Sequence, residues 1–364
     1  MSVTLDKVSR EVNGVAWIRD VSLTLERGTL SVLLGPTLSG KTSIMRLLAG
    51  LDKPTSGRIL VDGKDVTGFD VRKRSVAMVY QQFINYPTLT VYENIASPLR
   101  VQGVGRDEIE TRVRDAAKLL KLEPYFNRTP LQLSGGQQQR TAIARALGKG
   151  ADLVLLDEPL ANLDYKLREE LRTELPRIFE ESGAIFVYAT TEPSEALLLG
   201  GRTVCMGEGR ALQAGPTPDV YRRPDTVDVA EVFSDPPLNT VGIEKKNGSI
   251  FYSGGERASV AGLYEGLDDG AYKVGFRAHQ LDVAGTSPGR HAFVTTVSVT
   301  EITGSESFVH LKRDGYNWVA VLSGIHEFLP GQELDAVLDP NNLFIFDQSG
   351  RLVAAPAGHS HGSH

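Results

Sequence analysis

Cysteine is nearly absent from this 364-residue sequence. The single cysteine, Cys205, excludes an intramolecular disulfide and fits a reducing compartment. No apolar run approaches the roughly 18 residues that a helix needs to cross a bilayer. Residues 1–14 alternate apolar with polar or charged residues and lack the apolar segment of a signal peptide. These absences predict a soluble chain that stays in the cytoplasm and reaches a membrane only through a partner.

An excess of positive charge is also missing. The sequence has 39 lysines and arginines against 45 aspartates and glutamates, a formal net charge of −6. A general nucleic-acid binder normally carries a strongly basic face, so no nucleic-acid partner is expected. The length exceeds that of one ordinary domain, and the hydrophobic content of 41% is that of a globular protein. Two domains are therefore predicted.

Up to about residue 225, β-rich runs alternate with helical patterns. Thr29–Leu34 is apolar and ends at a glycine turn, as a buried strand does. Ala151–Leu156 and Ile185–Ala189 are further buried strands, and apolar residues recur at helical spacing over residues 107–120. This alternation predicts a parallel sheet covered by helices.

The pattern changes after Pro224, where short alternating strands and glycine or proline turns replace the helical patterns. Several runs are candidate strands, which indicates a small β-barrel or sandwich. The clearest are Val274–Arg277, Val294–Val299, Ser307–Leu311, Trp318–Leu322 and Leu343–Asp347. The last residues are rich in alanine, glycine, serine and histidine, which favours a disordered tail over a metal site.

A phosphate-binding motif follows the first buried strand. Residues 35–42 read G-P-T-L-S-G-K-T and match G-x-x-x-x-G-K-[ST] between a predicted strand and a predicted helix. The glycines let backbone N–H groups surround phosphates, Lys41 reaches the terminal phosphates, and Thr42 binds Mg²⁺. The alternative is a glycine-rich turn with a chance lysine. The candidate nucleotide-binding residues are Gly35, Pro36, Thr37, Leu38, Ser39, Gly40, Lys41, Thr42 and Ser43.

A second apolar strand ends in two carboxylates. Asp157, at its carboxyl end, can hold the Mg²⁺ shell, and Glu158 can accept a proton from an attacking water. Alone, an apolar run that ends in Asp-Glu is a common strand exit. Together with the phosphate loop, it predicts hydrolysis of ATP with Mg²⁺.

Residues 133–140 read L-S-G-G-Q-Q-Q-R directly before a predicted helix. A serine and two glycines at a helix start form a second anion-binding N-terminus, which one nucleotide in one chain does not need. A head-to-tail dimer does need it, because each turn closes over the other subunit's ATP. The alternative is an ordinary serine-capped helix. The residues of this turn are Ser134, Gly135, Gly136 and Gln137.

With this run the sequence resembles the ATPase subunits of ABC transporters, whose signature is Leu-Ser-Gly-Gly-Gln. The resemblance implies that Gln81 senses Mg²⁺ and couples to the membrane subunits, although a polar strand end is the alternative. It also implies that Asp164 lies in the loop that crosses the dimer interface, where the family usually has serine in place of Ala161. Residues 209–224 and the later β-rich part resemble the importers of maltose and glycerol-3-phosphate.

The resemblance implies an α/β P-loop NTPase fold with a helical subdomain, followed by an all-β, OB-like regulatory domain. The implied divisions are an ATPase domain over residues 1–230, its helical coupling part over 82–135, a β-barrel over 231–350 and a disordered tail over 351–364. The implied partners are a second ABC ATPase subunit, two transmembrane permease subunits and, indirectly, a periplasmic solute-binding protein. The expected location is the cytoplasmic face of the bacterial inner membrane.

Two positions depart from the family's pattern. Thr191 stands where the family has a histidine that contacts the γ-phosphate, and a threonine hydroxyl cannot carry positive charge at neutral pH. Val12 stands where an aromatic residue stacks on adenine; Trp17 either replaces it or is an ordinary half-buried tryptophan. Both changes fall on the chain's own ATP site and leave the Ser134 turn intact. A heterodimer with one strong and one weak site is therefore expected, and a homodimer with two slowed sites is the competing arrangement.

The expected function is ATP hydrolysis that powers import of a small polyol or carbohydrate. The phosphate loop and the run Thr191–Pro193 resemble bacterial glycerol importers, so glycerol is favoured over glycerol-3-phosphate or a sugar. One alternative is a regulatory subunit that binds nucleotide and hydrolyses little of it. Another is an ABC ATPase of DNA repair or ribosomes, which would be expected to carry coiled coils, zinc-binding cysteines or a second phosphate loop.

Overall fold

The computed structural model describes residues 1–82, 84–161, 163, 165–283 and 291–356. The chain divides into two compact units, Met1–Thr217 and Pro218–His364. This division falls before the boundary near residue 230 that the sequence suggests. The reason lies in α8 (Val227–Val232), whose Ala230 belongs to the same apolar cluster as Leu238, Phe344 and Phe346 of the second unit.

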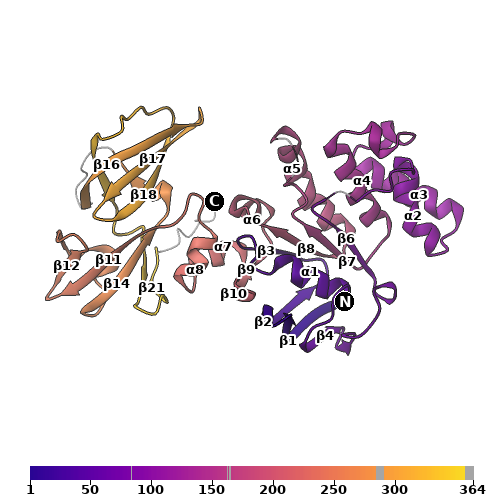
Figure 1. The fold of residues 1–364 in the computed structure, drawn as a ribbon, viewed down its shortest axis with the longest axis horizontal. Helices are drawn as coiled ribbons and strands as arrows, with labels where there is room; N and C mark the ends of the chain where they lie inside the picture. Colours follow the sequence, from indigo (N-terminus) through magenta and orange to yellow (C-terminus); the bar gives the residue numbers. More distant parts are fainter. Residues whose placement is uncertain (83, 162, 164, 284–290, 357–364) are drawn as a thin grey trace, which may run out of the picture. The chain divides into compact units, whose positions relative to one another are not determined.

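A six-stranded sheet forms the centre of the first unit (Figure 1). Its order is β10-β9-β3-β8-β7-β6, with β10 antiparallel at one edge and the other strands parallel. The strands are β3 (Leu30–Leu34), β6 (Val76–Val79), β7 (Leu153–Asp157), β8 (Ile185–Thr190), β9 (Arg202–Gly207) and β10 (Arg210–Pro216). Every residue of β7 and β8 is buried, which explains why these strands read as continuous apolar runs. The predicted parallel sheet is confirmed.

A smaller antiparallel sheet has the order β2-β1-β4-β5. Its strands are β1 (Ser2–Val12), β2 (Val15–Glu26), β4 (Ser56–Val61) and β5 (Lys64–Asp65). Val3, Leu5 and Val8 of β1 are buried in one core with Leu33 of the central sheet and Ile44 of α1. The two sheets therefore share a single apolar core, which fixes the β1–β2 hairpin next to the start of α1.

Helices α2 (Val91–Val101), α3 (Arg106–Leu119) and α4 (Gly135–Gly148) pack on one another to one side of the central sheet (Figure 1). Capping boxes at Thr90 and Ser134 fix where α2 and α4 begin. The helical pattern over residues 107–120 is confirmed, since α3 buries Ile109, Val113 and Ala116. The other elements are α1 (Lys41–Ala49), α5 (Tyr165–Ser182), α6 (Pro193–Leu199), η1 (Val71–Lys73), η2 (Glu123–Tyr125) and η3 (Pro130–Gln132). No helix in the described ranges is long and apolar enough to span a membrane.

The second unit consists mainly of two antiparallel sheets, ordered β13-β12-β11-β14-β20-β21 and β15-β19-β16-β17-β18. The first sheet contains β11 (Asn239–Lys246), β12 (Ser249–Tyr252), β13 (Arg257–Ser259), β14 (Gly270–Phe276), β20 (Phe344–Phe346) and β21 (Leu352–Ala354). The second contains β15 (Leu281–Asp282), β16 (His291–Ile302), β17 (Glu306–Arg313), β18 (Tyr316–Ser323) and β19 (Glu333–Leu338). Short helices complete the unit: α7 (Thr217–Arg222), which begins at the division, α8, η4 (Gly262–Tyr264) and η5 (Ala278–Gln280). Each candidate strand of the sequence overlaps one of these strands, and the predicted OB-like, all-β domain is confirmed.

One prediction for this unit is wrong. The disordered tail was expected to begin at residue 351, but Leu352–Ala354 form β21 and pair with β20. Leu352 packs on the cluster around Phe344 and Phe346, which gives the short strand an apolar anchor. Residues 357–364 lie outside the described residues.

Candidate functional site

The phosphate loop, residues 35–42, connects the carboxyl end of β3 to the start of α1. Two of its glycines are required by close packing. A Cβ on Gly35 would lie 2.4 Å from the Met206 carbonyl oxygen, and one on Gly40, whose φ is +103°, would lie 2.8 Å from Ile18 Cδ1. Pro36, Thr37 and Leu38 are exposed at the turn, and Ser43 is partly buried in the first turn of α1.

Lys41 is buried inside this loop. Its Nζ donates to the carbonyl oxygens of Gly35 (2.7 Å) and Pro36 (3.0 Å) and lies 3.8 Å from Glu158 Oε1. Burial lowers the pKa of Lys41, although the neighbouring Glu158 and Asp157 carboxylates act in the opposite direction. Ser39 Oγ is also buried and has no hydrogen-bond partner among the described residues. A buried cation and an unpaired hydroxyl in one glycine loop suit a phosphate ligand.

Asp157 and Thr42 bring two oxygen ligands together. Thr42 Oγ1 donates to Asp157 Oδ1 at 3.1 Å, joining the start of α1 to the end of β7. Burial raises the pKa of Asp157, and the hydrogen bond from Thr42 partly offsets this effect. A carboxylate and a hydroxyl are hard oxygen ligands, so the pair fits Mg²⁺.

At Glu158 the backbone departs from the extended conformation of β7. Its φ is +44°, an uncommon backbone conformation for a residue with a side chain, and its N–H donates to the Ala189 carbonyl at 3.0 Å. In this conformation its carboxylate accepts from Gln81 Nε2 at 3.0 Å and faces Lys41. The structure therefore brings together Lys41, Gln81 and Glu158, which the sequence could only assign separately.

Thr191 is exposed in the loop between β8 and α6. The residue before it, Thr190, is tied to the phosphate loop, because the Gly35 N–H donates to the Thr190 carbonyl at 3.4 Å. Thr191 is thus the first residue of the loop after β8. This loop starts at the carboxyl edge of the sheet, where Lys41 and Glu158 also lie.

Val12 and Trp17 lie on the β1–β2 hairpin, and both side chains are exposed, Val12 by 39% and Trp17 by 43%. In the strand register Arg10 pairs with Ile18 and Glu11 pairs with Ala16, so Trp17 is the extra residue of a β-bulge. A Cβ on Gly40 would lie 3.2 Å from the Trp17 carbonyl oxygen. The bulge therefore places Trp17 beside the phosphate loop, a position that periodicity in the sequence does not reveal.

The signature turn is a self-contained cap on α4. Ser134 Oγ accepts from the Gln137 N–H at 3.4 Å, and Gln137 Oε1 accepts from the Ser134 N–H at 3.1 Å. Ser134 and Gly135 are exposed, and Gly136 is buried. Ala161 is exposed and its N–H donates to the Glu158 carbonyl, whereas Asp164 lies outside the described residues.

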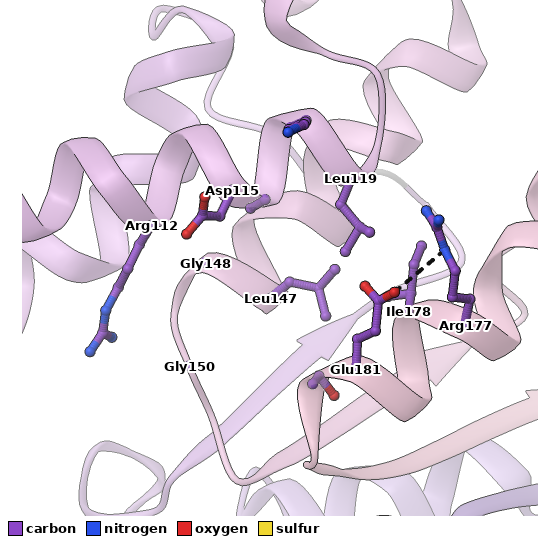
Figure 2. Close-up of a pocket in the computed structure, with 12 residues that line it drawn as sticks. Arg112, Asp115, Leu119, Leu147, Gly148, Gly150, Arg177, Ile178 and Glu181 are labelled. Carbon is purple, nitrogen blue, oxygen red and sulfur yellow. Dashed lines mark ion pairs between the residues drawn. The ribbon is translucent and has the colours of Figure 1, made fainter.

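A separate pocket of about 680 Å³ lies between α3, α4 and α5 (Figure 2). Leu119, Leu147 and Ile178 line it together with the Arg177–Glu181 ion pair. Gly150 and Ser182 also line it, and they precede β7 and β8. The pocket is thus at the amino ends of the parallel strands, opposite the edge where ligands of such sheets bind. No predicted site residue lines it.

Sequence reasoning missed a group of charged residues around the loop that contains Thr191. Arg168 and Arg172 of α5 contact Glu192, and Tyr188 and Thr190 contact Glu195. Arg172 is twenty positions from Glu192, so no local motif in the sequence signals the pairing.

Known proteins are similar to this chain in sequence and in fold. The sequence profile of the ABC transporter family matches residues 18–161. The trehalose/maltose import ATP-binding protein MalK of Thermococcus litoralis is 35% identical, over 95% of this chain and 98% of that protein. The sn-glycerol-3-phosphate import ATP-binding protein UgpC of Rhizobium meliloti is 35% identical, over 97% of this chain and 99% of that protein. A solved dimer of the ATP-binding cassette MJ0796 with ADP and Pi matches with a TM-score of 0.53 and 30% identity, over 59% of this chain and 98% of that one.

The fold and the phosphate site define a nucleotide-binding α/β ATPase. More particularly, the chain belongs to the ABC transporter family, with the ATP-binding subunits of carbohydrate and polyol importers as its relatives. It binds ATP and is an ATPase coupled to transport. The predicted family and the P-loop fold class are therefore confirmed.

Proposed function

We propose that this chain powers import of a small polyol or carbohydrate, acting through two transmembrane permease subunits at the cytoplasmic face of the inner membrane. One observation carries this proposal: importer ATP-binding proteins match 95% and 97% of the chain, the all-β unit included. Glycerol is the favoured solute, and glycerol-3-phosphate or a sugar is the alternative. A periplasmic solute-binding protein would deliver the solute to the permease subunits.

The phosphate loop supplies positive charge and N–H groups to ATP. Lys41 exchanges its bonds to the Gly35 and Pro36 carbonyls for the terminal phosphates. The backbone N–H groups at the start of α1 surround the same phosphates, since that end has no side-chain cap. ATP is thereby held at the carboxyl edge of the sheet.

Glu158 is the proposed general base. It accepts a proton from the attacking water, and Gln81, which already donates to its carboxylate, helps to orient that water. Thr42, Asp157 and Gln81 would hold Mg²⁺, which when bound neutralises charge on the β- and γ-phosphates.

At two positions this ATP site differs from the pattern of its family. Trp17, exposed beside the phosphate loop, takes the place of the aromatic residue missing at Val12 as the surface for adenine. Thr191 offers the γ-phosphate a neutral hydroxyl instead of an imidazolium, which slows hydrolysis at this site. The signature turn at Ser134 keeps its usual sequence and serves the ATP of the other subunit. These differences support a heterodimer with a second ABC ATPase subunit that holds the stronger site.

The segment from Gln81 to about Leu131 is the proposed contact with the permease subunits. Its Ile84 and Tyr86 are 55% and 52% exposed, which provides apolar surface close to Gln81 in the sequence. Arg145 of α4 donates to the Ile84 carbonyl and lies over the Tyr86 ring, so this surface is attached to the helix that carries the signature turn.

The test replaces Glu158 by glutamine in this chain alone, and the equivalent glutamate in any second ATPase, within the purified assembly. If only the change in the second ATPase abolishes turnover, the heterodimer with a weak site here stands. If Glu158→Gln alone is fatal, this site hydrolyses ATP despite Thr191. A single ATPase species in the natively isolated complex would establish the homodimer with two slowed sites instead.

The solute is tested separately, by uptake of labelled glycerol, glycerol-3-phosphate and maltose into vesicles that contain the assembly. ATP-dependent uptake of glycerol is the expected result. Uptake of none of these solutes would contradict the proposed solute class.

A further inference from the structure

A cluster of ionic contacts joins α5 to Glu192 and Glu195, which follow Thr191 in the chain. Arg172 of α5 is 12% exposed, and its Nη2 donates to Glu192 Oε2 and to Ser194 Oγ, both at 3.0 Å. Arg168, one turn earlier on α5, donates to Glu192 Oε1 at 2.9 Å. Two arginines thus each donate to a different oxygen of one carboxylate, and such charge-assisted hydrogen bonds are stronger than those between neutral groups. We call Arg168, Arg172, Glu192 and Glu195 the α5 clamp.

Glu195 extends the clamp into the core. Its carboxylate is nearly inaccessible, lies 3.7 Å from Arg172 Nε, and accepts from Tyr188 (2.9 Å) and Thr190 (2.6 Å) hydroxyls. Burial raises the pKa of Glu195, although the two hydroxyl donors act in the opposite direction. Because a buried carboxylate needs such partners, Glu195 fixes the Thr190 side chain.

Thr190 links the clamp to the catalytic groups. Its hydroxyl accepts from the Glu192 N–H at 3.0 Å, and its carbonyl accepts from the Gly35 N–H of the phosphate loop. One residue earlier, the Ala189 carbonyl accepts from the Glu158 N–H. Thr191 is therefore flanked on both sides by residues that α5, the phosphate loop and the base hold in place.

We propose that Arg172 and Glu192 are positioning residues, which fix Thr191 relative to the phosphate loop and Glu158. This inference rests on the γ-phosphate role proposed above for Thr191. A misplacement of about 1 Å can cost roughly 100-fold in rate, and a threonine is too short to recover a contact by rotating its side chain. The clamp also makes α5, which follows the Ala161 loop, the helix that sets the position of Thr191.

The position of Thr191 can be measured without relying on turnover. The variant Thr191→Cys provides one reactive thiol, because Cys205 is the only native cysteine and is buried, and burial raises its pKa to about 12. A spin label attached to that thiol in the purified full chain, before the chain joins its assembly, reports the mobility of the loop. Adding Arg172→Gln should increase the label's mobility. Adding Arg177→Gln should not, because Arg177 lies on the same helix with a 63% exposed side chain. Equal mobility in both backgrounds would overturn the proposal.

Kinetics of the unlabelled assembly test the consequence. In an assembly whose second ATPase carries the change equivalent to Glu158→Gln, single-turnover hydrolysis reports kcat of this site alone. Arg172→Gln and Glu192→Gln should each lower that kcat by roughly 10- to 100-fold with the KM for ATP unchanged within about twofold. Arg172→Lys, which keeps the charge but loses the planar fork, should recover only part of the rate. A parallel loss of ATP binding and thermal stability would make Arg172 merely structural and overturn the proposal. If the label becomes mobile while kcat is unchanged, the clamp holds the loop and the assigned role of Thr191 is what fails.

Discussion

Helices α1 and α4 both start at glycine-containing turns, but only α4 has a side chain that caps its first N–H groups. α1 begins after Gly40, which is in the left-handed conformation and provides no side-chain cap. α4 begins after Ser134, whose hydroxyl and N–H both pair with Gln137 in a capping box. An uncapped start leaves its N–H groups for a phosphate, whereas the capping box of α4 already pairs the N–H groups of Ser134 and Gln137.

This difference is consistent with the proposal that the two helix ends serve two different ATP molecules. The α1 end lies beside the side chains proposed to bind ATP and hydrolyse it, Lys41, Asp157 and Glu158. The α4 end exposes Ser134 and carries its own capping box, which supports the role proposed for it at the ATP of another subunit.

Removing the cation of the α1 end should have the largest effect. Lys41→Ala is expected to weaken ATP binding and lower hydrolysis at this site by about 10²–10³-fold, because no other cation is buried in the described part of this loop. Binding of fluorescent ATP and single-turnover hydrolysis measure this. The matched control is Lys53→Ala, an exposed lysine beyond the end of α1, which should leave both unchanged. Wild-type ATP binding by Lys41→Ala would refute the phosphate site.

Trp17 lies beside the start of α1, so a substitution there tests the α1 end separately from the α4 end. Trp17→Ala should weaken ATP binding roughly 5- to 150-fold, which corresponds to about 1–3 kcal/mol of base stacking, and Trp17→Phe should retain most of the affinity. Val12→Ala should change little. Isothermal titration calorimetry with ATP measures the difference in affinity between these variants. Equal affinities of Trp17→Ala and wild type would assign Trp17 a structural role.

The smallest expected effect is at the α4 end. Ser134→Ala removes the cap and should lower the free energy of unfolding by about 1 kcal/mol, while the affinity of this chain's own site for ATP stays the same. Ser134→Asn, which also caps helices well, should keep the stability. Thermal unfolding and ATP titration of the same samples test both statements. A weaker affinity at the chain's own site would mean that the two helix ends are not independent.

Local sequence was enough to predict much of this protein. The buried strands β3, β7 and β8 could be predicted because each is a short apolar run, and the α1 loop could be predicted because its spacing is fixed by phosphate geometry. The strand β21 was missed because its three residues gain their stability from packing on Phe344 and Phe346, which a local pattern does not show.

The sequence by itself determined which candidate groups this protein has. They are Lys41, Thr42, Asp157 and Glu158 for the proposed phosphate and metal site, Ser134 for the proposed second anion site, and Thr191 where the family's pattern has a histidine. Only the tertiary structure decided how they meet. The positive φ of Glu158 and the α5 clamp on Glu192 depend on contacts between segments far apart in the chain, and the bulge at Trp17 depends on the register of the β1–β2 hairpin. Such contacts form when the sheet and its core assemble, and a single sequence does not record them.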